Sequence, residues 1–516
     1  MRLTELGYLL VPLGLLLMLF VKSRALLHLM VFLSPFTAST IVISEGSRFG
    51  MQPAFWFGLL FAFVALAKKN FRSLRFTVAQ IRFTWLIAIF LLYSGVSLTF
   101  PFIQDLIGIS PTLINPGMIE EQPSQSGFQI FSLTQFAYLT FYLLVSFCVM
   151  IEVRDYEDAR SLIRTLIISA IVTVLWGLGV QYSSFFLGFQ YPDWIFNNHP
   201  GYSQGFEEHL RIIPRLSSVA PEPSMFGYFL LIVISLLLTL NLTRDYIYGR
   251  LFQKSVLLLL VFAAVIGTSS TAYVGLLLVG AFLPISSLCA KKFSWGQLVA
   301  AALIQLKYVV YFTVFLLGLV ALVGKVLPHA DLEDLVGIMN VVTLGKMDVG
   351  SGVDRFAAFL KGLEILVETS FIGTGWGSNS TFDLFSTLLA NIGIVGFVLF
   401  LGMIGFPLYY CWSWHRRARD AYGSALALGL VHSIIIGLAL MFLSVPGFIF
   451  MFFWIMFGLL LAWPKLRATQ ITRKTTAGSY PRSSVGNALY GIIRIAVGNS
   501  DHVAAPVELR AEVRNL

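Results

Sequence analysis

Long apolar runs dominate the sequence and restrict its fold more than any other feature. About 13 runs occur along the 516 residues, and they are about 18–22 residues long. A backbone crosses hydrocarbon only when its hydrogen bonds are satisfied internally, in a helix or a closed barrel. The runs lack the period-two alternation of barrel strands. The sequence therefore predicts an all-α, polytopic integral membrane protein with about 12–14 transmembrane helices.

The composition and the placement of charge agree with this prediction. Hydrophobic residues make up 57% of the chain and charged residues 12%, about half the charged fraction of a soluble domain. Much of the positive charge lies in short loops between apolar runs, as in 68–82 and 415–419. Lysine and arginine in short cytoplasmic loops set the orientation of membrane proteins. The net charge of +9 therefore indicates topology, and no nucleic-acid partner is expected.

The three cysteines, Cys148, Cys289 and Cys411, lie within or near the expected inner ends of helices. They cannot form a disulfide framework, and no Cys-x-x-Cys or His/Cys spacing typical of a zinc site occurs. We expect no metal and no cofactor.

The charged loops divide the chain into two parts and two sides. Residues 1–463 form the expected transmembrane domain, and residues 464–516 an expected basic cytoplasmic tail without stable structure. If the basic loops face the cytoplasm, the two longest segments, 182–223 and 328–381, are outer (periplasmic) loops. The N-terminus then lies outside with an odd number of spans, or inside if the first run does not cross.

The first outer loop ends in "RLSSVAPEPSMFG", where a charged stretch meets the start of a span. Prolines flank Glu222, and Ser224 is the expected N-cap of the following helix. Glu222 then lies near a positive helix N-terminus, which stabilises a carboxylate. The pattern indicates either a capping and anchoring device or a functional carboxylate paired with, or held by, Arg215.

The second outer loop contains an expected amphipathic helix. From Val353 to Val367 apolar residues recur at helical spacing, which is typical of a helix lying along a membrane surface. Arg355 lies at its start. The turn "GTGWGSN" follows, but without a strand–turn–helix context it is weak as a phosphate loop in its own right.

Three arginines on the expected outer side, Arg211, Arg215 and Arg355, run against the usual charge bias of membrane proteins. Each of them could simply pair with one of the loop acids. Together they indicate an anion site, because guanidinium forks fit phosphate oxygens. The anion most available at a lipid boundary is a lipid-linked pyrophosphate.

Three stretches carry a resemblance to a known family. They are "RLSSVAPEPSMFG", then "GTSSTAYVGLLL" at 267–278, and the block "DRFAAFLKGLEILVETSFIGTGWGSNSTFDLFSTLLANIGIVGFVLF", with its Arg…helix…Gly-x-Gly…Gly-x-x-Gly order. Over roughly 84–463 the chain resembles the O-antigen ligase/polymerase superfamily of bacterial cell-surface polysaccharide assembly. The motifs of this superfamily are short and degenerate.

The resemblance implies a metal-independent, lipid-donor glycosyltransferase that works at the outer face of the bacterial inner (plasma) membrane. Its donor would be a glycan on undecaprenyl pyrophosphate, and its product an O-antigen, capsule or exopolysaccharide. Arg215 and Arg355, with Arg211 as a weaker third, would bind the pyrophosphate, and Glu222 would be a base or orienter. A chain-length regulator and a flippase of the same pathway are the expected partners.

One departure from the family pattern favours the polymerase branch. O-antigen ligases carry a histidine before their Gly-x-x-Gly, and its spacing falls here on Phe382, eleven residues before Gly393. The general base is therefore left unassigned.

Three alternatives remain beside the polymerase. The first is an O-antigen ligase-type enzyme that transfers a finished glycan to lipid, protein or peptidoglycan. The second is a transporter or lipid-linked oligosaccharide flippase, which would carry charges along a central path and have short outer loops. The third is a structural membrane component, in which the outer charges have no chemistry.

Overall fold

The computed structural model describes most of the chain. The described residues are 1–20, 22–44, 50–68, 76–108, 130–199, 204, 209–210, 213–267, 269–290, 351–417, 423–444 and 448–476. Arg211, an expected span at 308–327, residues 328–350 of the second outer loop and residues 477–516 of the tail lie outside them.

Helices form nearly all of the regular structure in the described residues. In chain order they are α1 (Glu5–Leu19), α2 (Ser23–Leu33), α3 (Pro53–Lys68), α4 (Val78–Ser97), α5 (Phe100–Leu106), α6 (Ile130–Glu152), α7 (Tyr156–Trp176), the π-helical turn η2 (Gly177–Gln181), α8 (Tyr182–Leu187), α9 (Pro223–Leu242), α10 (Arg250–Ile266), α11 (Ser270–Ala290), α14 (Ser351–Glu368), α15 (Leu384–Arg417), α16 (Ser424–Ser444) and α17 (Met451–Thr476).

Two small antiparallel sheets of two-residue strands accompany the helices. The first has the order β1-β2-β3, and the second pairs β4 with β5. The strands are β1 (Arg2–Leu3), β2 (Val42–Ile43), β3 (Gly50–Met51), β4 (His209–Leu210) and β5 (Ile213–Pro214). The predicted all-α class therefore describes everything except these short pairings.

The apolar helices have the length and composition of membrane spans. Seven described helices are long and apolar enough to cross a membrane, and four shorter apolar helices accompany them. The chain is thus a multi-pass helical membrane protein by these criteria. The predicted number of about 12–14 spans is not reached within the described residues. The apolar segments α1, α2, α3, α10 and Ser270–Leu283 of α11 are shorter than 18 residues, and the expected span at 308–327 lies outside the described residues.

Local sequence signals explain where several helices begin. Thr77 and Gln80 form a capping box at α4, in which each side chain bonds the backbone of the other. Asp155 caps α7 by accepting a hydrogen bond from the backbone of Asp158. The predicted amphipathic helix at 353–367 is confirmed as α14, with Arg355 in its first turn.

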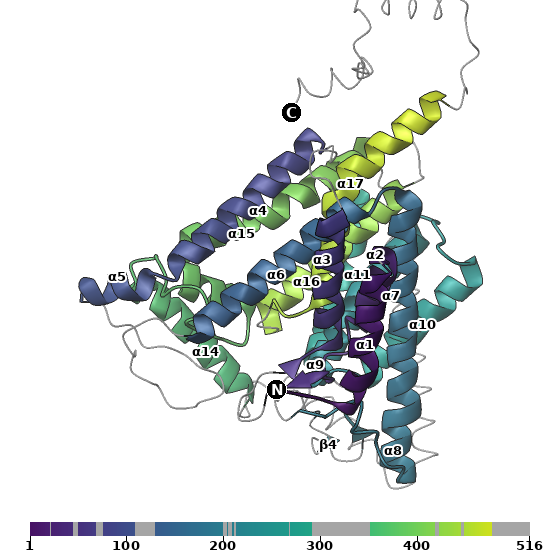
Figure 1. Cartoon of the computed structure of the whole chain (residues 1–516), viewed down its shortest axis with the longest axis horizontal. Coiled ribbons are helices and arrows are strands. Elements are labelled where there is room, and N and C mark those ends of the chain that lie inside the picture. Colours follow the sequence, from purple (N-terminus) through teal and green to yellow (C-terminus); the bar gives the residue numbers. More distant parts are fainter. Residues whose placement is uncertain are drawn as a thin grey trace, which may run out of the picture. The chain divides into compact units, whose positions relative to one another are not determined.

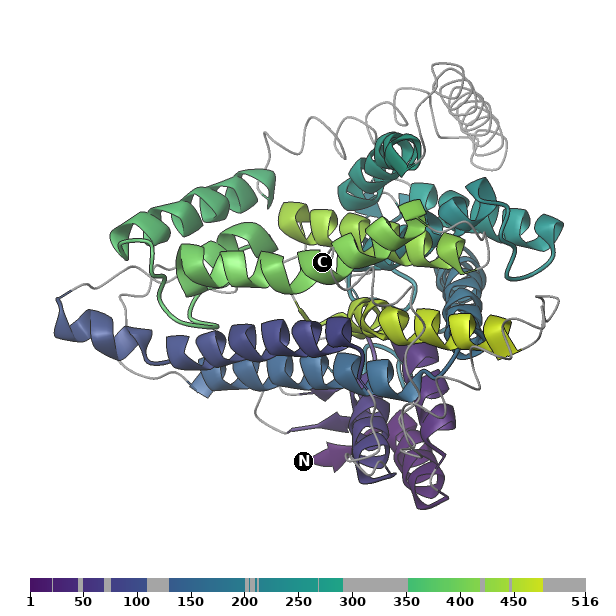
Figure 2. The ribbon, with the colours of Figure 1, turned by 90° about the horizontal axis from the view of Figure 1, so that it is seen from above.

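Contacts between helices define the core. Helix α9 packs against α16, and α15 packs against both α16 and α4. Figure 1 shows α4 running along α15, and Figure 2 shows α4 running along α6. Most side chains of α9 are buried, and apolar residues lie on all sides of it, as expected for a helix inside a bundle.

Hydrogen bonds at the helix ends place these ends in two groups, one at each end of the bundle. At one group, called the basic end below, Arg160 at the start of α7 bonds Asp245, just after α9, and Lys465 bonds the carbonyl of Val153. At the other group, called the loop end, the backbone N–H of Ala38 donates to the carbonyl of Val219 at 3.0 Å.

The N-terminus belongs to the loop end. The backbone N–H of Thr4 donates to the carbonyl of Ile41, and β1 pairs with β2 a few residues from Ala38. The first apolar helix therefore starts on the same side as the Arg215–Glu222 stretch.

The chain divides into two compact units, Met1–Lys465 and Leu466–Leu516. The sequence predicts a boundary between a transmembrane domain and a tail at residues 463 and 464, which stays a prediction. The expected lack of stable structure in the tail stays a prediction, because residues 477–516 lie outside the described part. The site described next lies in the first unit.

Candidate functional site

The stretch that follows Arg215 is buried inside the loop end. Leu216, Ser218 and Val219 have no exposed surface, and Ser217 and Ala220 are almost fully buried. Ser218 has a positive φ of 54°, which is uncommon for a residue other than glycine. A backbone in this conformation persists only where its surroundings hold it firmly.

Two glutamines hold this turn through its backbone. Gln181 Oε1 accepts from the N–H of Ser218 at 2.8 Å, and its Nε2 donates to the carbonyl of Arg215 at 3.1 Å. Gln204 Nε2 donates to the carbonyls of Ser218 and Ala220. These bonds satisfy the N–H of Ser218 and the carbonyls of Arg215, Ser218 and Ala220, as burial of backbone polar groups requires.

The tyrosine Tyr191 adds a further donor to the same turn. Its hydroxyl donates to the carbonyl of Ser218 at 3.4 Å and accepts from Trp176 Nε1. Burial raises the pKa of Tyr191, while the hydrogen bonds with Trp176 and Gln204 act in the opposite direction. The hydroxyl therefore stays protonated and remains a donor at neutral pH.

The π-helical turn η2 explains how Gln181 reaches the turn. Five residues at the end of α7 adopt i→i+5 bonding, and Gln181, the last of them, is buried. Such single π-turns occur often at functional sites, because they redirect one side chain inside a helix. Gly177 in this turn leaves room for Leu216, since a Cβ there would lie 2.8 Å from its Cδ1.

We expect Gln181→Leu to destabilise the protein by about 2 kcal/mol, because it leaves a buried N–H and a buried carbonyl without their partner. The melting temperature of the purified protein in detergent should fall. Gln190→Leu is the matched control, because Gln190 is exposed, and its effect should stay within about 0.5 kcal/mol. Equal melting temperatures for the two variants would contradict this account of the turn.

Helix α9 begins directly after the buried turn, and here one prediction is wrong. The N-cap is Glu222 and Pro223 is the first helical residue, so Ser224 lies inside the helix and is not the cap. The hydroxyl of Ser224 instead donates to Glu222 Oε2 at 2.8 Å. Proline suits the first helical position because its missing N–H would have no partner there.

Glu222 is exposed at the loop end, and its carboxylate is held by Ser224. Among the described residues it forms no ion pair with Arg215, so the predicted pairing of the two is not observed. The N-terminus of α9 stabilises its negative charge. The role of Glu222 as a base or orienter stays a prediction.

The three stretches that carry the family resemblance meet at the loop end. A Cβ on Gly267, at the end of α10, would lie 3.6 Å from the carbonyl oxygen of Leu216. On α11, Ala272 lies against Gly227 of α9, and Thr271 Oγ1 lies 2.9 Å from Ser444 Oγ at the end of α16. Residues far apart in sequence thus form one continuous series of contacts.

Arg355 completes this series. Its Nη1 donates to the carbonyl of Ser444 at 3.4 Å, and its Cζ lies 5.3 Å from the centre of the Phe382 ring. No carboxylate among the described residues lies within ion-pair distance of Arg355. The alternative that it simply pairs with a loop acid is therefore not observed in the described part of the chain. Within the described part of the chain, its charge is held by neutral groups, the Ser444 carbonyl and the Phe382 ring.

The glycine-rich turn after α14 is a packing device and not a phosphate loop. The N–H groups of Thr374 and Gly375 donate to the carbonyls of Ala390 and Asn391, and the N–H of Trp376 donates to Ser97 Oγ. These groups are therefore occupied within the protein. The turn joins α4, α15 and the end of α14, which fixes the position of the segment that leads to Phe382.

A break in α15 receives this turn. Gly393 interrupts the helix with φ 63° and ψ −169°, a conformation essentially restricted to glycine. A Cβ on Gly373 would lie 2.6 Å from Gly393 N, so the two glycines lie almost in contact. The Gly-x-Gly and Gly-x-x-Gly elements of the sequence are thus two halves of one contact.

A buried histidine in the bundle does not supply the missing base. His432 of α16 is almost fully buried, and its two ring nitrogens lie 2.8 Å from Thr239 Oγ1 and 2.7 Å from Ser286 Oγ. Both nitrogens are occupied, so the ring links α9, α11 and α16. The sequence alone does not reveal the roles of His432, Thr239 and Ser286. It does not reveal those of Gln181 and Ser444 either.

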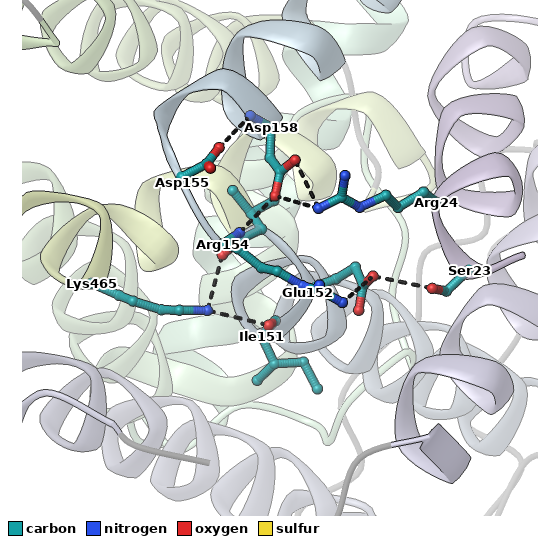
Figure 3. Close-up of polar contacts among 9 residues, drawn as sticks. Ser23, Arg24, Ile151, Glu152, Arg154, Asp155, Asp158 and Lys465 are labelled. Carbon is teal, nitrogen blue, oxygen red and sulfur yellow. Dashed lines mark hydrogen bonds and ion pairs between the residues drawn. The ribbon is translucent and has the colours of Figure 1, made fainter. Parts of the chain in front are cut away.

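A second polar cluster lies at the basic end, and its contacts are structural (Figure 3). Lys465 Nζ donates to the carbonyls of Ile151 and Val153, which are left without helical partners where α6 ends. The buried carboxylate of Glu152 accepts from Ser23, and the two lie at the ends of different helices. The positive charge of Lys465 also suits the C-terminus of α6.

The loop between α6 and α7 is held in the same cluster. Asp158 accepts from the backbone of Arg154 at 3.1 Å and pairs with the Arg24 guanidinium at 3.0 Å (Figure 3). Asp155 caps α7 from the same loop. These groups satisfy one another, so the cluster ties α2, α6, α7 and α17 together.

The arrangement at the loop end is therefore the candidate site. Two of the three predicted arginines, Arg215 and Arg355, lie at opposite ends of one series of contacts, with Glu222 at the start of α9. Arg211 lies outside the described residues. Comparisons with protein-family models, curated proteins and solved structures find no match to this chain.

Proposed function

We propose that this chain is a membrane glycosyltransferase that polymerises undecaprenyl-pyrophosphate-linked oligosaccharide repeat units into a cell-surface polysaccharide. One observation carries the proposal. The turn after Arg215, the α10–α11 turn, the end of α16 and Arg355 form a continuous series of contacts at one end of the bundle. The three stretches that resemble the polymerase family are thus neighbours in space.

The charge of the site supports a pyrophosphate ligand. Arg355 has no carboxylate partner among the described residues, and a guanidinium fork binds phosphate oxygens with two parallel hydrogen bonds. A cation that pairs with no acid of the described residues is available there to an external anion. Helical spans around the site would let a lipid-linked donor approach from the bilayer.

The proposed reaction forms one glycosidic bond for each donor consumed. A hydroxyl of the acceptor glycan attacks the anomeric carbon of the donor sugar, and the bond from that carbon to the pyrophosphate oxygen breaks. Undecaprenyl pyrophosphate leaves with the bonding electron pair, and the hydroxyl proton passes to a base. Arg215 and Arg355 would stabilise the negative charge that develops on the leaving group, and Glu222 is the candidate to orient or deprotonate the hydroxyl.

The orientation follows from the positive-inside rule. The basic end carries Arg154, Arg160 and Lys465, and Lys68 Nζ donates there to Ser23 Oγ, so this end would face the cytoplasm of a bacterial inner membrane. The loop end would then face outward, where lipid-linked repeat units are displayed. A flippase that delivers them and a chain-length regulator are the proposed partners.

A reconstitution experiment tests the proposal. Purified full-length protein in vesicles is given undecaprenyl-pyrophosphate repeat units, and the products are resolved by size. We expect a ladder of longer glycans. Transfer of the glycan to an added lipid or protein acceptor without a ladder would instead identify a ligase, and movement of unchanged substrate across the bilayer would identify a flippase.

A further inference from the structure

The ring of Phe382 lies beside the candidate site and is one of two groups of the described residues that contact the Arg355 guanidinium. The distance of 5.3 Å from Arg355 Cζ to the ring centre lies within the range of cation–π attraction. The other contact is a single hydrogen bond of 3.4 Å to the carbonyl of Ser444, which is long for such a bond. Among the described residues, the aromatic ring is therefore the main contact that limits how the guanidinium is oriented.

The residues on both sides of Phe382 are fixed firmly. Thr381 Oγ1 donates to the carbonyl of Asp383 at 2.7 Å and lies 2.6 Å from Thr387 Oγ1. Asp383 Oδ1 accepts from the backbone of Ser386 at 2.7 Å, as an N-cap of α15 does. Phe382 thus projects from a segment whose backbone is held at both ends.

The helix that carries Arg355 is fixed against the same segment. A Cβ on Gly362 would lie 3.0 Å from Ser386 Cβ, so α14 and the start of α15 approach closely. Phe359 and Phe385 stack with ring centres 6.3 Å apart. Arg355, Phe359 and Gly362 are spaced i, i+4 and i+7, so they share the face of α14 that meets α15. The side chain of Arg355 is then the flexible part that remains to be oriented.

We propose that Phe382 is a positioning residue, which holds the Arg355 guanidinium in place for a pyrophosphate without neutralising its charge. A carboxylate at this place would orient the guanidinium equally well, but it would compete with the anionic ligand. A phenyl ring attracts the cation through its face and leaves the N–H donors at the guanidinium edge for phosphate oxygens. This inference rests on the proposed function for the identity of the anion.

Inorganic pyrophosphate is the probe that separates this inference from the polymerase activity. Its binding to the purified full-length protein in lipid nanodiscs is measured by titration calorimetry in metal-free buffer. We expect Arg355→Ala to remove the binding and Phe382→Leu to weaken it about 3- to 30-fold, the range that a lost cation–π contact explains. Phe382→Trp keeps a ring and should retain affinity within about threefold of the natural protein.

Phe356→Leu is the matched control. Phe356 is the next residue of α14, its side chain is 57% exposed, and its ring stacks on Phe359. The Arg355 guanidinium lies over the ring of Phe382. Its pyrophosphate affinity should equal that of the natural protein. If Phe382→Leu fails to fold, Phe382→Met provides the same comparison with Phe382→Trp, and melting temperatures report the folded state of every variant.

Each outcome distinguishes the two proposals. Unchanged affinity in Phe382→Leu, with binding lost in Arg355→Ala, overturns the positioning role and leaves the polymerase standing. The expected pattern of affinities without any glycan ladder supports the positioning role and overturns the polymerase. If the natural protein binds no pyrophosphate, or Arg355→Ala binds it equally well, the positioning role falls and the polymerase loses its anion site. In the ladder assay Phe382→Leu should lower kcat/KM, and Phe382→Trp should restore it.

Discussion

Replacing Arg355 by alanine is expected to lower the rate of chain growth about 100- to 1000-fold, the loss typical when one donor to a developing negative charge is removed. The guanidinium contacts only a carbonyl oxygen and a phenyl ring among the described residues, so the alanine leaves no buried carboxylate unpaired. The protein should therefore fold, and the loss should appear in catalysis. The measurement is the rate at which the glycan ladder grows from purified repeat units.

Two further variants make this result specific. Lys361→Ala removes a positive charge from the same helix, but Lys361 pairs with Glu364 at 3.0 Å, so the rate of this variant should change less than about twofold. Arg355→Lys keeps the charge and loses the fork, and we expect partial activity. Normal growth of the ladder in Arg355→Ala would remove Arg355 from the proposed mechanism.

Replacing Gly393 by alanine is expected to prevent stable folding. The added Cβ would lie against the carbonyl oxygens of Phe371 and Ile372, far inside van der Waals contact, and the backbone of Gly393 has a conformation that alanine rarely adopts. Both the turn and α15 are fixed by hydrogen bonds here, so neither can move without losing them. We expect a loss of several kcal/mol and little folded protein after detergent extraction.

The same helix provides matched controls for the glycine. Gly402 and Gly405 have no atom within 4 Å of an added Cβ. Gly402→Ala and Gly405→Ala should therefore fold normally or gain about 0.5–1 kcal/mol, because alanine favours a helix. The yield of monodisperse protein after size exclusion measures the difference. If Gly393→Ala matches these controls, the break in α15 has been interpreted wrongly.

The sequence predicts the apolar helices of the described residues well, because the signal of such a helix is a property of a single segment. Apolar runs of sufficient length, the amphipathic face around Phe359 and the charged helix ends are each visible without knowledge of their neighbours. The start of α14 near Arg355 is predicted correctly for the same reason. The cap of α9 is wrongly predicted, because Pro223 fits the first helical position and shifts the boundary from Ser224 to Glu222.

The parts that the sequence does not reveal depend on contacts between distant segments. The role of Gln181 depends on a π-turn that brings it to Ser218, and no periodicity marks such a turn in advance. The contact between Gly373 and Gly393 pairs two motifs that look like separate glycine signals in the sequence. In the sequence, Phe382 is notable only because it stands at a position where a histidine is expected. Its distance from Arg355 in the structure suggests a role of its own.

The most direct test of the proposed polymerase reaction measures how much leaving group is released. The protein is reconstituted with undecaprenyl-pyrophosphate repeat units, and released undecaprenyl pyrophosphate is quantified beside the glycosidic bonds formed. We expect one molecule of undecaprenyl pyrophosphate to be released for each glycosidic bond formed. In Arg355→Ala, the release and the bond formation should fall together. Glycan growth without release of undecaprenyl pyrophosphate, or no growth from this donor at all, would contradict the proposed reaction.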